Sequence, residues 1–244
     1  MRKLLLALLL LGAPALGVAA GAEGVALMKA RVDPGDTASL QRGAKLFVNY
    51  CAGCHSAEYM RFNRVAQDLG LPEDLVEQYL IFTDAKIGDT MQTAMNPQDG
   101  ERWFGVAPPD LTLTARRRGA DWLYTYLNSF YRDESKAVGV NNLVFPDVGM
   151  PHVLWELQGM PQPVYSDNGS DGLQVVGVRV PEGAGAMTEQ EYQAATRDLT
   201  NFMAYMAEPV KAERQALGIK VLLFLSVFLL LTWLLKREYW KDVH

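Results

Sequence analysis

A pair of cysteines separated by two residues, with a histidine directly after the second, most constrains what this chain can fold into. These residues form the segment Cys51-Ala52-Gly53-Cys54-His55, and the 244-residue chain has only these two cysteines. Two thiols at this spacing can both add to the vinyl groups of one haem, and the histidine that follows then lies beneath the ring as an iron ligand. The motif therefore predicts one haem c, attached covalently through Cys51 and Cys54, with His55 as the proximal ligand.

Other uses of a closely spaced cysteine pair are a disulfide, a redox pair and part of a zinc site. Zinc would need further ligands, and the only histidines besides His55 are His152 and His244. A redox pair does not need a histidine directly after it. The histidine and the lack of other cysteines therefore favour haem attachment.

The first twenty residues have the three-part layout of a secretory signal peptide. Arg2 and Lys3 precede an apolar run, and small residues follow it. The apolar run is too short to span a bilayer, so residues 1–20 are predicted to direct export and to be removed after Ala20 or Ala22.

A second apolar segment, residues 219–235, predicts a single C-terminal transmembrane helix. At 1.5 Å per residue it spans about 25 Å, close to the thickness of the hydrocarbon core. Basic residues are equally numerous on its two sides, so the signal peptide decides the orientation. Residues 23–210 are then a periplasmic domain anchored in a bacterial cytoplasmic membrane, and residues 236–244 are a cytoplasmic tail.

Helical patterns lie on both sides of the domain. Before the cysteine motif, small and apolar residues recur at helical spacing: Leu40, Gly43, Ala44 and Phe47. Near the far end, Thr188 and Glu191 are spaced as a capping box, and the helix that follows is expected to end near Ala207. Residues 165–181 have the alternation and turn residues of a short hairpin, with turns expected at Asn168-Gly169 and Asp171-Gly172. The fold class is therefore mainly α, with long loops and one short β-hairpin.

The residues alone leave the sixth iron ligand open among three candidates. A methionine opposite the histidine favours ferrous iron and raises the reduction potential. Met150 follows Gly149, which permits close backbone approach, and it precedes Pro151, which stiffens the loop. Met160 has a similar context and is the second candidate. His152 is the third, and it would lower the potential.

The formal net charge of −5 argues against a nucleic-acid partner, since phosphate binding needs a basic face. Most of the negative charge lies between the two terminal segments. An acidic surface there can attract a basic protein partner, or it can serve solubility alone.

Four segments of the chain, in order, resemble the cytochrome c1 family, the haem subunit of the bacterial cytochrome bc1 complex. They are QRGAKLFVNYCAGCHSAEYMRFNR, APPDLTLTARRRGADWLYTYLNSFYRD, VFPDVGMPHVLWELQG and DLTNFMAYMAEP. The single C-terminal anchor extends the resemblance to nearly the whole chain. In c-type cytochromes the first and last helices cross near the haem edge, and Gly43 and Phe47 match the contacts of that crossing.

The resemblance also implies roles for individual residues. Met150 would be the second axial ligand, and the stretch that contains Pro109 would line the haem pocket. Arg118 would pair with a haem propionate, which suits a forked guanidinium. Trp122 and Tyr126 would lie near the haem or in an aromatic core, on a helix that Asp121 can cap.

A function follows from the same resemblance. The chain would accept single electrons from the Rieske iron–sulfur protein and pass them to a soluble or tethered cytochrome c. It would do so in a dimeric quinol–cytochrome c reductase, beside the cytochrome b subunit that oxidises quinol, and it would catalyse no reaction by itself. The alternatives are a haem enzyme or gas sensor with an open iron position, an assembly subunit with a structural haem, and a tethered cytochrome that serves another enzyme.

Overall fold

The computed structural model describes residues 25–167 and 173–242. The predicted signal peptide, residues 1–20, and the predicted turn residues Asn168-Gly169 and Asp171-Gly172 lie outside the described residues. The helices are α2 (Thr37–Tyr50), α3 (Phe62–Leu69), α4 (Glu73–Tyr79), α5 (Pro97–Phe104), α6 (Thr114–Arg118), α7 (Ala120–Asn128), α8 (Trp155–Gln158), α9 (Glu189–Ala207) and α10 (Lys211–Tyr239). The strands are β1 (Ala57–Arg61), β2 (Thr90–Met91), β3 (Phe130–Arg132), β4 (Val140–Asn142), β5 (Gln162–Asp167) and β6 (Leu173–Arg179).

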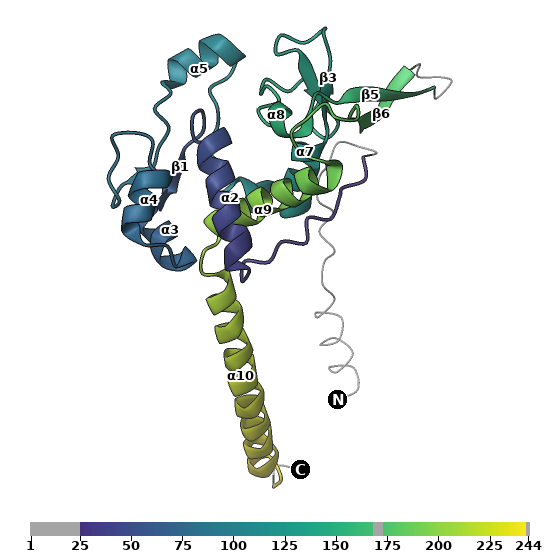
Figure 1. The fold of residues 1–244 in the computed structure, drawn as a ribbon. Helices are drawn as coiled ribbons and strands as arrows, with labels where there is room; N and C mark the ends of the chain where they lie inside the picture. The colour runs from purple at the N-terminus through teal and green to yellow at the C-terminus, as the bar shows by residue number, and fades with distance from the viewer. Residues whose placement is uncertain (1–24, 168–172, 243–244) are drawn as a thin grey trace.

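The strands pair in sequence order into small antiparallel sheets of two strands each, β1–β2, β3–β4 and β5–β6. The helices therefore supply most of the core, as the mainly α prediction requires. The predicted hairpin is confirmed, since β5 pairs with β6 along its whole length. In Figure 1 it projects from the side of the domain.

The crossing of α2 and α9 forms the centre of the domain (Figure 1). Phe47 of α2 is fully buried, and its ring centroid lies 5.7 Å from that of Phe202 on α9. At Gly43 the helices approach so closely that an added Cβ would lie 2.7 Å from the Cβ of Phe202 and would overlap the backbone oxygen of Asp198. The predicted roles of Gly43 and Phe47 in a helix crossing are thus confirmed.

Specific caps fix where the two crossing helices begin. The side chain of Asp36 accepts a hydrogen bond from the backbone N–H of Ser39 and starts α2. Thr188 and Glu191 form the predicted capping box at the start of α9. Each cap satisfies backbone donors that the first turn of a helix leaves without partners.

The prediction that Asp121 caps α7 is wrong. Gly119 is the N-cap residue of this helix, and no side chain caps it. The carboxylate of Asp121 instead accepts hydrogen bonds from Lys29 Nζ (2.8 Å) and the backbone N–H of Ala30 (2.9 Å). Gly119, at φ +93°, turns the chain from α6 into α7 two residues earlier, so Asp121 lies inside the first turn. It thereby ties the N-terminal segment to α7.

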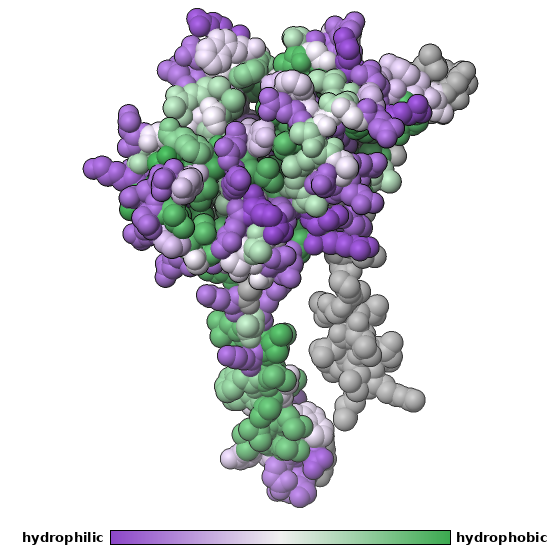
Figure 2. Space-filling model, viewed as in Figure 1, coloured by the Kyte–Doolittle hydropathy of each residue, from purple (hydrophilic) through white to green (hydrophobic). Residues whose placement is uncertain are grey.

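The C-terminal helix α10 leaves the domain as a single rod, and hydrophobic residues cover much of it (Figures 1 and 2). Within the described part of the chain it contains the one candidate membrane span, Glu213–Tyr239, none of which is buried in the protein. The helix is longer than the predicted span of residues 219–235, because helix-forming polar residues extend it at both ends. The short apolar segment is therefore the centre of a longer helix.

We predict that Gly43→Ala destabilises the domain by about 2 kcal/mol or more, because the new methyl group would meet backbone rather than a movable side chain. Thermal unfolding of the purified protein measures this as a Tm lowered by several degrees. Gly88→Ala is the matched control, since nothing lies within 4 Å of a Cβ at that position. Equal Tm values for the two variants would contradict a close helix crossing.

Candidate haem site

A cavity of about 260 Å³ opens between the end of α2, the loop before α6, helix α7, the loop after β4 and one face of α9. Its walls are mainly apolar and aromatic. A smaller cavity of about 70 Å³ adjoins it and shares His55, Pro109 and Met150 in its lining. The predicted site residues Cys51, His55, Pro109, Arg118 and Met150 all line the larger cavity, and Cys54 lines the smaller one. The fold therefore brings together residues that are up to 99 positions apart in the chain.

The two cysteines follow directly from the last turn of α2. Cys51 is the C-cap residue of this helix, and its carbonyl accepts hydrogen bonds from the N–H groups of Cys54 (3.0 Å) and His55 (2.9 Å). Both thiols are free. Burial raises the pKa of Cys51 to about 12 and also raises that of Cys54. A redox pair needs a thiol with a lowered pKa, so this environment argues against that alternative.

His55 is held in one orientation by the chain opposite. Its Nδ1 lies 2.7 Å from the carbonyl oxygen of Pro109. A carbonyl only accepts, so Nδ1 carries the proton and Nε2 keeps its lone pair for a metal. Burial lowers the pKa of His55 and keeps the ring neutral. Pro109, predicted only to line the pocket, thus also orients the proposed ligand, as carbonyls commonly do for metal-binding histidines.

Of the three candidates for the sixth ligand, only Met150 lines the cavity that contains His55. The hydroxyl of Tyr126 donates a hydrogen bond to its sulfur at 3.3 Å. Burial raises the pKa of Tyr126 far above its usual value, so this hydroxyl keeps its proton. The ring of His152 instead stacks on Phe130 at 5.0 Å, and burial lowers the pKa of His152 to about 4.

Arg118 provides a positive charge at the cavity wall. Its guanidinium lies 4.8 Å from the ring centroid of Trp122 and 5.7 Å from that of Phe145. No carboxylate of the described residues forms an ion pair with it. Arg117 lines the cavity as well and was not predicted. The helical spacing of Thr114, Arg117 and Arg118 is the sequence pattern that could have revealed it, since these three share one face of α6.

These residues fit a covalent haem c. The cavity offers two free thiols, an oriented neutral imidazole, a thioether, apolar walls and a guanidinium that has no carboxylate partner among the described residues. Cys51 and Cys54 would hold the group, and His55 and Met150 would bind its iron. Bound there, haem c would supply a one-electron iron couple.

The Cytochrome C1 family model matches residues 28–243. The chain belongs to the cytochrome c1 family. It is 52% identical to cytochrome c1 of Allochromatium vinosum over the full length of both chains. It is 51% identical to the ammonia monooxygenase gamma subunit of Nitrosomonas europaea, over 99% of this chain and 97% of that protein. Cytochrome c1 of Rhodospirillum rubrum is 26% identical, over 85% of this chain and 83% of that protein.

The family establishes the general role of the chain. It is an electron carrier of the bc1 complex with covalent haem c, and a membrane-anchored subunit with one candidate C-terminal span. The sequence-based predictions of family, fold class, cofactor and electron-transfer role are thereby confirmed. The individual ligand residues remain predictions that rest on the geometry above.

We predict that Tyr126→Phe lowers the midpoint reduction potential of the purified protein. The hydroxyl withdraws electron density from the Met150 sulfur, so its loss makes the sulfur a better donor and favours ferric iron. A net hydrogen bond is worth about 1 kcal/mol, and one electron converts 1.4 kcal/mol to about 59 mV, so we expect a decrease of some tens of millivolts.

Redox titration of the wild-type protein and of Tyr126→Phe measures the decrease in midpoint potential. Tyr131→Phe is the control, because Tyr131 is equally buried and lies outside the cavity lining. An unchanged or higher potential in Tyr126→Phe would show that the hydroxyl does not act on the sulfur.

Proposed function

We propose that this chain accepts one electron at a time from the Rieske iron–sulfur protein and passes it to a soluble or tethered cytochrome c. It does so in a dimeric quinol–cytochrome c reductase that contains a cytochrome b subunit, where quinol is oxidised. The observation that carries this proposal is that His55 and Met150 line one cavity. Two protein ligands, His55 and Met150, would bind the iron and leave no position for a substrate, which favours electron transfer over catalysis or gas sensing.

Each residue of the site has a separate task in this proposal. Cys51 and Cys54 form the thioether bonds that keep the cofactor in the exported protein. His55, oriented by Pro109, and Met150 would bind the iron in both oxidation states, so that little would reorganise when the charge changes. The Arg118 guanidinium balances the negative charge of a propionate in a largely apolar wall.

The rim of the cavity supports electron exchange with a partner protein. Val106 and Phe145 both line the cavity, and these residues are 57% and 41% exposed. An exposed apolar rim allows another protein surface to come close to the cavity and to exclude water. The partner on this face would be the acceptor cytochrome c.

The membrane topology follows from the two terminal segments. We place residues 23–210 in the periplasm after removal of the signal peptide, residues 219–235 in the hydrocarbon core, and residues 236–244 in the cytoplasm. The anchor would keep the domain within reach of a mobile donor in the same complex. Support comes from the candidate span Glu213–Tyr239 of α10, which is not buried in the protein and has the basic residues Lys236 and Arg237 in its last turn.

Redox-difference spectra of the complex purified from membranes test the proposal. With quinol as reductant, we expect reduction of a c-type haem that a quinol-site inhibitor blocks, together with copurifying b-type haem and Rieske signals. A c-type haem that purifies alone and ignores quinol would contradict this place in the complex. Binding of carbon monoxide by the reduced wild-type protein would instead favour a haem enzyme or a gas sensor.

A further inference from the structure

The loop that carries Met150 has almost no regular structure of its own. It runs from the end of β4 to α8, and the structure therefore needs another means of holding the methionine in the cavity. The residue at the start of this loop, Asn142, is 1% exposed and ends strand β4. A polar side chain buried so completely is costly unless its hydrogen bonds are made.

The side-chain amide of Asn142 both accepts and donates such hydrogen bonds. Its Oδ1 accepts hydrogen bonds from Ser129 Oγ (3.1 Å) and from the backbone N–H groups of Val144 (3.0 Å) and Phe145 (3.2 Å). Its Nδ2 donates to the backbone carbonyl of Tyr126 at 2.8 Å. One side chain thus fixes the first turn of the Met150 loop and attaches it to the end of α7.

Tyr126 connects this attachment to the proposed ligand. Its carbonyl accepts the bond from Asn142, while its hydroxyl donates to the Met150 sulfur. Phe145, whose N–H is held by Asn142, also packs its ring against those of Tyr126 (6.5 Å) and Trp122 (6.3 Å). The loop is therefore joined to α7 at its beginning by Asn142 and near its end by Met150.

A second asparagine supports the middle of the loop. Asn141 Oδ1 accepts hydrogen bonds from the backbone N–H groups of Asn142 and Asp147, both at 2.9 Å. Asp147 has φ +60°, a conformation that is uncommon for residues other than glycine and that aspartate adopts more readily than most. The hydrogen bond from its N–H to Asn141 Oδ1 holds the loop three residues before Met150.

From these contacts we infer that Asn142 is a positioning residue for the sixth ligand: it holds the Met150 loop against α7 so that the thioether stays in the haem cavity, beside the Tyr126 hydroxyl. This inference rests on the ligation of the iron by Met150 under Proposed function. An amide is required because the position needs an acceptor for three donors and a donor for one carbonyl. Leucine has a similar shape and supplies neither, and an ionised aspartate supplies only the acceptor.

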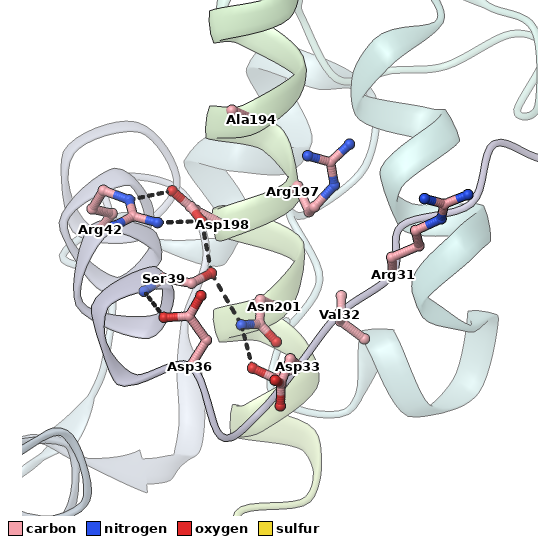
Figure 3. A pocket seen from close by; sticks show the side chains of 10 residues that line it. All are labelled: Arg31, Val32, Asp33, Asp36, Ser39, Arg42, Ala194, Arg197, Asp198 and Asn201. Carbon is pink, nitrogen blue, oxygen red and sulfur yellow. Dashed lines mark hydrogen bonds and ion pairs between the residues drawn. The ribbon is translucent and has the colours of Figure 1, made fainter.

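A matched control lies on the other side of the crossing, in the cleft of Figure 3 between α2 and α9. Asn201 there is 2% exposed and donates hydrogen bonds to the carbonyl of Asp33 (2.7 Å) and to Ser39 Oγ (3.0 Å). It does not line the haem cavity. Asn201→Leu therefore removes a buried amide of the same kind without touching the Met150 loop.

The test compares the sulfur-to-iron charge-transfer band of the ferric holoprotein and carbon monoxide binding by the ferrous holoprotein in full-length variants. For Asn142→Leu we expect loss of most of the band and a rise of about tenfold in the fraction that binds carbon monoxide, because three buried donors lose their acceptor. For Asn201→Leu we expect a lower Tm with both spectroscopic values unchanged. Asn142→Asp, at a pH at which its carboxyl is ionised, keeps the accepted bonds and loses the donated one, so its band should then be intermediate.

In one outcome, Asn142→Leu lowers the Tm as much as Asn201→Leu does, yet keeps the full charge-transfer band and binds no carbon monoxide. That result would show that Asn142 is only structural. If Asn142→Leu yields no holoprotein, Asn142→Asp decides, and a wild-type band in that variant at a pH at which its carboxyl is ionised overturns the inference. Met150→Ala separates the two proposals. If Met150→Ala keeps the band, the ligand assignment itself is wrong; if it loses the band while Asn142→Leu keeps it, only the role of Asn142 fails.

Discussion

Helices α2 and α9 meet at Gly43, where no side chain larger than hydrogen fits against the backbone of the partner helix. This close approach of the two helices affects both the segment that follows α2 and the cavity wall that α9 supplies. Cys51 follows from the last turn of α2, so the crossing sets the place of the cysteine turn and of His55. Leu199 and Met203 on α9 line the haem cavity, so the same crossing supplies one of its walls. The position of the proximal ligand thus depends on a helix packing contact made two turns earlier in the chain.

The rest of the cavity is built from loops, and hydrogen bonds between distant segments hold those loops in place. Pro109 fixes the ring of His55, Tyr126 contacts the sulfur of Met150, and Asn142 attaches the loop of Met150 to α7. Each bond joins an irregular segment to a residue of the site or to a helix. An electron carrier benefits from such bonds, because a site that is already organised changes little when the iron changes charge. The cofactor adds apolar surface to the same cavity, and it would stabilise the loops further.

Residue patterns within single segments predicted the elements that depend mainly on neighbouring residues: helices, a helix cap and the membrane span. The spacing of Gly43 and Phe47, the capping box at Thr188 and the apolar run of residues 219–235 each correspond to an element of the fold. Patterns within one segment could not decide between Met150, Met160 and His152. All three lie in loops, and only the tertiary fold decides which one reaches the cavity. There the resemblance to the cytochrome c1 family supplied what the residues alone left open.

The contacts that sequence reasoning missed are those that join distant segments. Asp121 was predicted to cap a helix, but its carboxylate accepts hydrogen bonds from Lys29 and Ala30 of the N-terminal segment. No pattern of neighbouring residues predicts these contacts. The hydrogen bond from His55 Nδ1 to the Pro109 carbonyl spans 54 positions of the chain, and a backbone carbonyl has no signature in the sequence. Arg117 lies in a run of three arginines. Residue type does not distinguish these arginines, because the geometry of the helix decides which of their side chains reach the cavity.

The central claim is that the Cys51–His55 segment holds a covalent haem, and the intact mass of the denatured protein tests it most directly. We expect the mass of the exported chain plus one haem, retained after acid extraction, with a haemochrome spectrum typical of two thioether bonds. In Cys51→Ala the spectrum should shift to that of a single thioether bond, and in the variant lacking both cysteines the added mass should be lost. A wild-type chain that carries no haem after acid extraction would contradict the account.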